Sequence, residues 1–402
     1  MDLLKKFLYL TLITFPLGVI IRINIFKSTY IYPLDVAVFA VFLTILFISI
    51  KIKKNIFSFP NIKALYYFIG IAFFALVLNS YFLTPQTFLV SFFYLFRFII
   101  YSSLILAFNY LDAGFSKKFT YYLSLSGFLF VVFGLAQYLF YPDLRKLYYL
   151  GWDKHLYRLF STTLDPNFAG AIIVLELLLL FSLFQKKIIR KNLSKIIYMV
   201  GLLLTSVSLF LTYSRSSFIM LSVSGLSYLV VTKQKREIVL LIAFIVFGIL
   251  FLPKSLKSEG VDLLRRASIS SRAESIASAL DIFKNSPVFG IGFNTYRYAQ
   301  ERRGMLDPEN WEITHSGAGV PNSFILALVT TGLTGFIFYL NFWVRVVRKA
   351  YLGIIPGKNL YFKAAVFSSL IGVLTHALFE NTLFYSFVMF WVFILLSFKD
   401  YK

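Results

Sequence analysis

The chain has 402 residues, of which 59% are hydrophobic and only 14% are charged, whereas soluble domains carry about a quarter charged residues. This composition excludes an ordinary soluble protein. The formal net charge of +22 arises from lysines in short links between apolar runs, a pattern typical of membrane topology and not of nucleic-acid binding. The chain has no cysteine, which excludes disulfides, thiolate metal sites and cysteine nucleophiles.

Apolar runs of membrane-spanning length recur along the whole chain and predict an all-α membrane protein with about twelve transmembrane helices. The polar stretches between them are too short for a separate domain, so residues 1–402 are expected to form one membrane domain. The first run lacks a cleavage site of small residues and is interpreted as a span, not a signal peptide. The runs lie near 7–21, 33–50, 64–83, 88–108, 119–141, 167–184, 196–212, 217–231, 238–253, 321–343, 360–379 and 382–398.

Lysine and arginine concentrate in alternate links, which predicts that both termini lie in the cytoplasm. The two long polar stretches, 142–166 and 254–320, then both fall on the outer face of the membrane, together with the short turn at Ser214–Ser216. Chemistry is therefore expected on the extracytoplasmic side, with 254–320 as a large loop inserted between spans.

The large loop carries several arginines followed by an amphipathic stretch. Ile276, Leu280 and Phe283 recur at helical spacing after Arg272, which predicts a helix lying at the membrane interface. The glycine-containing run 289–294 follows as a tight turn. An interfacial helix and turn without any chemistry is the alternative interpretation.

Arg215 lies in the outer turn between two predicted spans, beside Ser214, Ser216 and Ser217. A guanidinium among hydroxyl groups at this depth is suited to bidentate binding of a diphosphate. An arginine that only anchors the turn at the lipid headgroups is the alternative.

Arg97 and Glu176 lie at similar depth inside two predicted spans. Ionisable groups inside a membrane are expensive and often functional, so an ion pair between them is a hypothesis, with a purely structural salt bridge as the alternative.

The chain has three histidines, and His315 lies in a polar outer segment rich in small residues. An imidazole in this position is suited to act as a general base toward a hydroxyl, and an exposed loop histidine without a role is the alternative. His155 has the same two interpretations, whereas His376 is expected to be a packed polar residue.

Several signatures are absent from the sequence: a phosphate-binding loop of the P-loop type, His-Glu-x-x-His, Gly-x-Ser-x-Gly and an Asp-x-Asp pair in an outer loop. Nucleotide-driven transport, zinc or serine hydrolysis and a dedicated divalent-metal site are therefore not indicated, and no cofactor is expected.

Four segments between residues 150 and 340 together resemble the O-antigen ligase and polymerase family of membrane glycosyltransferases. Each is weak alone, but their order and spacing agree with that family. They are Arg158–Asn167, the Ser-Arg-Ser turn at Arg215, Arg272–Gly292 with its Pro-x-x-Gly-x-Gly run, and Asn322 followed by Gly332 and Gly335. The sequence departs from the family at one position, since Pro321 stands where the ligase motif has a histidine before the asparagine.

The resemblance implies a GT-C-like fold in the cytoplasmic (inner) membrane and transfer of a glycan from a polyprenyl diphosphate carrier to an acceptor hydroxyl, with inversion and without a metal. The acceptor would be another glycan or a lipid A core. His315, Arg215 and Arg272 are the catalytic candidates that follow, and Arg158, Arg215, Arg272, Asn322 and Arg97 are the candidates for substrate binding. A polysaccharide flippase or exporter without transferase activity is the competing function. It would need a polar path through the middle of the membrane, and Arg97 is the one residue that supports such a path.

Overall fold

The computed structural model describes residues 1–26, 29–52, 62–185, 192–250, 267–306, 311, 319–354, 357 and 359–398. Most of these residues form helices, and a short antiparallel hairpin of β1 (Ile23–Phe26) and β2 (Thr29–Ile31) is the sheet among them. The α-helices are α1 (Asp2–Thr14), α2 (Pro33–Lys51), α3 (Lys63–Leu78), α4 (Pro85–Ser102), α5 (Ala113–Phe140), α6 (Pro166–Gln185), α7 (Asn192–Leu211), α8 (Arg215–Val231), α9 (Lys235–Leu250), α10 (Ala267–Lys284), α11 (Tyr296–Arg302), α12 (Ser323–Leu352), α13 (Leu360–His376) and α14 (Ser386–Ser397).

Each of the twelve predicted spans overlaps one of these helices. Five helical segments are long and apolar enough to cross a membrane, namely α2, α4 with its continuation to Tyr110, α5, α6 and α12. Five further apolar helices are shorter: α3, the 195–211 part of α7, α8, α13 and α14. The prediction of an all-α membrane protein is therefore confirmed, whereas the count of twelve spans and the GT-C-like assignment stay predictions.

The helix starts follow ordinary capping chemistry. Proline occupies the first position of α2, α4 and α6, where its missing N–H costs no helical hydrogen bond. Asp35 accepts a hydrogen bond from the Tyr32 N–H at 2.9 Å, and Thr84 accepts one from the Thr87 N–H at 3.2 Å. Local sequence thus determines where these helices begin.

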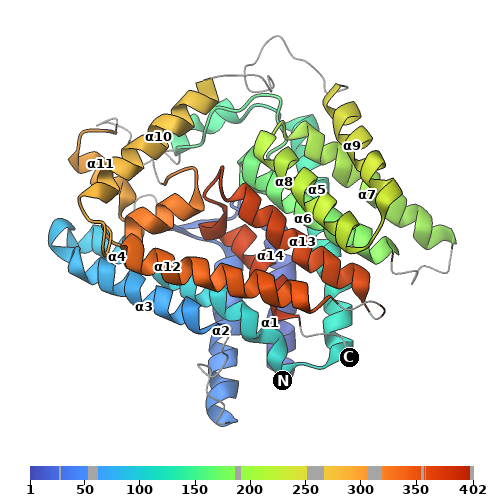
Figure 1. The fold of residues 1–402 in the computed structure, drawn as a ribbon, viewed down its shortest axis with the longest axis horizontal. Helices are drawn as coiled ribbons and strands as arrows, with labels where there is room; N and C mark the ends of the chain where they lie inside the picture. The colour runs from blue at the N-terminus through green and yellow to red at the C-terminus, as the bar shows by residue number, and fades with distance from the viewer. Residues whose placement is uncertain are drawn as a thin grey trace.

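The C-terminal helix α14 lies in the interior of the bundle, and almost all of its residues are buried. It packs against α4, α6 and the 3-10 helix that continues α4 from Ser103 to Tyr110. Around it, α13 packs against α8 and α6, and α12 packs against α3 (Figure 1). The two chain ends lie at one end of the view, and α10 and α11 lie at the opposite end (Figure 1).

Helix α12 is broken at Gly332, whose backbone has φ 66° and ψ −174°. The 287–292 segment fills the break. The Ile291 and Gly292 N–H groups donate to the carbonyls of Val329 and Thr330, each at 3.0 Å, while the Leu333 N–H donates to the Pro287 carbonyl at 2.9 Å. The break therefore leaves these backbone groups bonded inside the protein, as an apolar environment requires.

Replacement of Gly332 by alanine is expected to destabilise the protein strongly. This backbone conformation is open essentially to glycine alone and costs other residues about 1–3 kcal/mol, and a Cβ would lie 2.2 Å from the Val288 carbonyl oxygen. Gly304 is a matched control, because it also has a positive φ of +65° but a Cβ there would meet no atom within 4 Å. We expect Gly332→Ala to lower the melting temperature in lipid several times more than Gly304→Ala; equal shifts would contradict the close approach.

Candidate functional site

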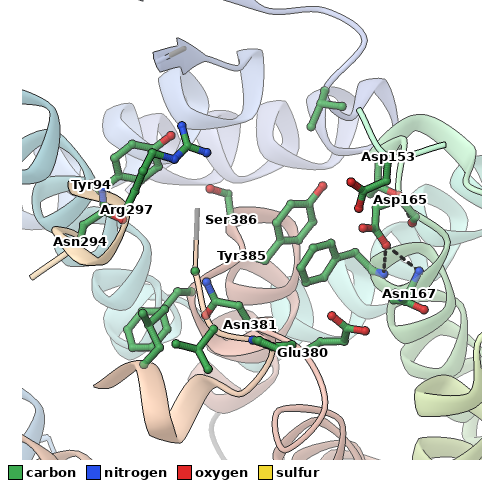
Figure 2. Close-up of a pocket in the computed structure, with 18 of the residues that line it drawn as sticks. Tyr94, Asp153, Asp165, Asn167, Asn294, Arg297, Glu380, Asn381, Tyr385 and Ser386 are labelled. Carbon is green, nitrogen blue, oxygen red and sulfur yellow. Dashed lines mark hydrogen bonds between the residues drawn. The ribbon is translucent and has the colours of Figure 1, made fainter. Parts of the chain in front are cut away.

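A cavity of about 760 Å³ opens where the start of α6, α4, α10 and the link between α13 and α14 converge. Figure 2 shows Asp153, Asp165 and Asn167 along one side of it and Tyr94, Asn294 and Arg297 along the other. Its lining also includes the side chains of Arg97, Lys154, His155, Arg158, Arg272, Pro321 and Glu380. Opposite charges thus share one enclosure inside an otherwise apolar bundle.

The link between α13 and α14 separates the two sides. Glu380, Asn381 and Tyr385 line the cavity from this link, and Ser386 lines it from the start of α14. The Tyr385 ring stacks on Phe168 with a centroid separation of 4.0 Å and an interplanar angle of 7°. Stacking against α6 holds this part of the link in place, so the polar groups beside it have a defined position.

Arg97 is buried and lies against the cavity, but its partner is Asp35 and not Glu176. The Arg97 Nη2 atom lies 2.8 Å from Asp35 Oδ2, while Glu176 accepts a hydrogen bond from the Ser124 hydroxyl at 2.8 Å. The predicted Arg97–Glu176 pair is therefore wrong. Equal depth in two spans does not determine which way each side chain points around its helix axis, and here α4 turns Arg97 toward α2.

Arg158 joins the first two segments of the family resemblance. Its guanidinium is buried, and Nε donates to the Thr212 carbonyl at 2.8 Å while Nη2 donates to the Tyr213 carbonyl at 3.4 Å. Asn167 lies beside the same turn, where its Oδ1 accepts from the Ser214 hydroxyl at 2.9 Å. Arg158 thus stabilises the turn that precedes α8 and also lines the cavity.

Arg272 of α10 forms an ion pair with Glu380 inside the cavity. Burial, together with the nearby carboxylates of Asp165 and Asp153, raises the pKa of the Glu380 carboxyl to about 8, although Arg272 and Arg158 lower it. A carboxyl whose pKa lies near neutral pH is suited to accept a proton during a reaction.

The other predicted site residues lie elsewhere. Arg215 is the first residue of α8 and is not among the residues that line the cavity. Asn322 caps α12, since its Oδ1 accepts from the Phe324 and Ile325 N–H groups at 2.9 and 3.0 Å and its amide donates to the Leu378 carbonyl at 3.0 Å. His315 lies outside the described residues. Catalytic or binding roles for these three remain predictions.

Sequence reasoning did not identify Asp35 and Glu380. Each had a signal: Asp35 follows Pro33 at the start of an apolar run, and Glu380 is the one acidic residue in the apolar stretch 360–398. A single carboxyl in such a stretch is a candidate by the same argument that selected Arg97.

A metal ion was not expected from the sequence, yet the structure brings a possible ligand group together. Asp153, His155 and Asp165 place ligand atoms within 4.8 Å of one another. The Asp165 carboxylate already accepts from the Asn167 N–H at 2.7 Å, and Arg158 Nη1 lies 3.5 Å from His155 Nδ1. A fixed positive charge at this distance disfavours a divalent cation on these atoms.

Comparison with protein families gives one match that bears on this site. Residues 200–340 match the family model described as O-Antigen ligase. The chain has no match among the curated proteins with which it was compared. The family match covers about a third of the chain and includes the turn at Arg215, α10 and the broken helix α12, and it confirms the predicted resemblance to the O-antigen ligase and polymerase family for this region.

The Asp35 carboxylate is expected to be essential for stability. It accepts from Arg97 and from the Tyr101 hydroxyl, each at 2.8 Å, and removing one partner of a buried pair costs about 3–5 kcal/mol. We expect Asp35→Ala to lower the melting temperature in lipid by many degrees. Asp143→Ala is the matched control, because it removes an exposed ion pair with Arg145, and such pairs contribute little. Similar shifts in both variants would contradict a stabilising role for the buried pair.

Proposed function

From the match of residues 200–340 to the O-antigen ligase family, we propose that the protein is a membrane glycosyltransferase. It transfers a glycan from a polyprenyl diphosphate carrier to an acceptor hydroxyl, on the outer face of the cytoplasmic membrane. The observation that carries the proposal is the cavity, because segments distant in the sequence deliver four arginines to its lining: Arg97, Arg158, Arg272 and Arg297.

The chemistry explains why arginines suit this reaction. When the glycan leaves its carrier, the diphosphate oxygen gains negative charge, and fixed donors in a partly dry site stabilise that charge most effectively. A guanidinium also matches two phosphate oxygens at once. Arg272 is the proposed principal donor, because it projects from α10 into the cavity and its partner Glu380 also lines it.

The remaining candidates support the same reaction from different positions. Arg158 holds the turn from which α8 begins, and Arg215, next to Ser214 of that turn, is proposed to reach the diphosphate at the cavity edge. Arg97 is proposed to bind the glycan from the α4 side. Asn322 is proposed to orient the start of α12 beside the acceptor.

His315 stays a candidate base outside the described residues. The acceptor is a second lipid-linked glycan if the protein is a polymerase and a lipid A core if it is a ligase. Transfer is proposed to invert the anomeric centre and to need no metal.

Reconstitution tests the function directly. We expect purified protein in lipid to convert a polyprenyl-diphosphate-linked oligosaccharide to a ladder of products if it is a polymerase, or to an acceptor-dependent single product if it is a ligase, both read on a gel. Arg272→Ala should reduce the rate about 10²- to 10³-fold, as expected for loss of one charge-stabilising donor. Arg303→Ala is the control, because Arg303 pairs with exposed Asp281 away from the cavity lining. Absence of product, with the lipid-linked glycan instead crossing vesicle bilayers, would indicate a flippase.

Chelation tests the role of metal. We expect the transfer rate to be unchanged in EDTA, since arginines supply the positive charge and Arg158 lies beside the possible ligand His155. A metal would instead be assigned to Asp153, His155 and Asp165 if EDTA abolished activity, added Mg²⁺ or Mn²⁺ restored it, and the Asp153→Asn variant were inactive.

A further inference from the structure

We propose that Glu380 is the general base that accepts the proton of the attacking hydroxyl. The inference rests on the proposed glycan transfer and names the residue that activates the acceptor. It starts from a position in the fold: Glu380 lies in the link between α13 and α14 and lines the cavity, although it is outside the four sequence segments that carry the family resemblance.

The start of α12 is bonded directly to this link. The Ser323 N–H donates to the Ala377 carbonyl at 2.8 Å, and the Ser323 hydroxyl donates to the Glu380 carbonyl at 3.1 Å. Pro321, which stands where the ligase motif has a histidine, is two residues before Ser323 and lines the same cavity as Glu380. Glu380 therefore supplies a carboxyl to the same cavity that Pro321, at the position of the motif histidine, also lines.

One of the two oxygens of the Glu380 carboxylate accepts a hydrogen bond. Oε1 accepts from Arg272, and no group among the described residues donates a hydrogen bond to Oε2. A guanidinium has five N–H donors in a planar fork, so Arg272 is able to hold Glu380 with one edge and the diphosphate with another. Base and leaving group are then positioned by the same side chain.

Two other carboxylates near the cavity are already committed to backbone or buried partners. Asp165 accepts from the N–H groups of Asn167 and Phe168 at the start of α6, and Asp35 accepts from Arg97 and Tyr101. At Asp165 burial raises the carboxyl pKa, and these two N–H groups lower it and so oppose burial. Asp153 is the remaining carboxyl of the lining, and it is the rival in the experiment below.

The charges around Glu380 come from every side of the cavity. Arg272 approaches from α10, and Arg158 and the carboxylates of Asp153 and Asp165 approach from the 150–166 stretch. The titratable His376, whose Nδ1 lies 2.6 Å from the Thr382 hydroxyl, precedes Glu380 at the end of α13. Burial and the two carboxylates raise the pKa of Glu380, whereas both arginines lower it, and the balance is a pKa of about 8. Glu380 is thus a stronger base than an exposed glutamate and is partly ionised near neutral pH.

The step balances without any further reactant. The acceptor oxygen forms a bond to the anomeric carbon while its proton passes to Glu380 Oε2. The bond from that carbon to the diphosphate oxygen breaks, and its electron pair leaves with the diphosphate, whose charge Arg272 stabilises. The proton on Glu380 returns to solvent after the product leaves.

The experiment measures kcat/KM against pH in lipid for the wild-type protein, Glu380→Gln, Glu380→Asp, Asp153→Asn and the control Asp281→Asn. The wild-type value should rise about tenfold per pH unit below about 8 and then level, because the base must lose its proton to act. Glu380→Gln should lower kcat/KM about 10²- to 10⁴-fold and should abolish this rise with pH, called the pH limb below. Glu380→Asp should keep activity, but its pH limb should lie at a different pH from that of the wild type. Asp281 lies on α10, as Arg272 does, and its exposed carboxyl pairs with Arg303. Asp281→Asn should therefore match the wild type.

The outcomes separate the two proposals. A Glu380→Gln variant that keeps the wild-type limb would overturn the role of Glu380, and a limb lost only in Asp153→Asn would assign the base to Asp153. If Glu380→Gln does not fold, an undisplaced limb in Glu380→Asp would overturn the role instead. Absence of product from the wild-type protein at every pH would overturn the proposed function itself.

Discussion

Backbone groups at the break in α12 must find partners inside the protein, and much of the site depends on how they do so. In an apolar bundle an unbonded carbonyl or N–H costs several kcal/mol. The carbonyls of Val329 and Thr330 are bonded by Ile291 and Gly292, which fixes the segment after α10 against α12. This contact sets the position of α10, and therefore of Arg272, relative to the cavity.

A second constraint acts on the opposite side through Arg158. Its guanidinium donates to the carbonyls of Thr212 and Tyr213, which follow α7, and so joins the stretch before α6 to the turn before α8. The four segments that resemble the family thus contact one another in two pairs, and the two pairs meet at one cavity. Their order in the chain reflects packing partners as well as chemistry.

The arginines of the lining differ in what holds them. Arg97 forms an ion pair with Asp35 in the first turn of α2, and Arg158 donates hydrogen bonds to backbone carbonyls. Arg272 differs because its partner, Glu380, also lines the cavity. Of the two ion pairs, Arg272–Glu380 is the one with both members in the cavity lining, as the roles proposed for them require.

The sequence by itself determined the helices and the class of protein. Long apolar runs have no other way to satisfy their backbone in a membrane than as helices, and proline and acidic or hydroxyl caps mark their starts, as at Pro33 and Thr84. The family resemblance, with Arg158 and Arg272 in it, was also readable from motifs in chain order.

Tertiary structure alone decided which side chains meet. Arg272 and Glu380 are 108 residues apart, and Arg97 and Asp35 are 62 apart. Hydropathy gives the depth of a side chain in a span but not its direction around the helix axis, so it suggested Glu176 as the partner of Arg97 and gave no reason to join Glu380 to α10. Such directions follow from how helices pack, and packing is a property of the whole bundle and not of any single segment.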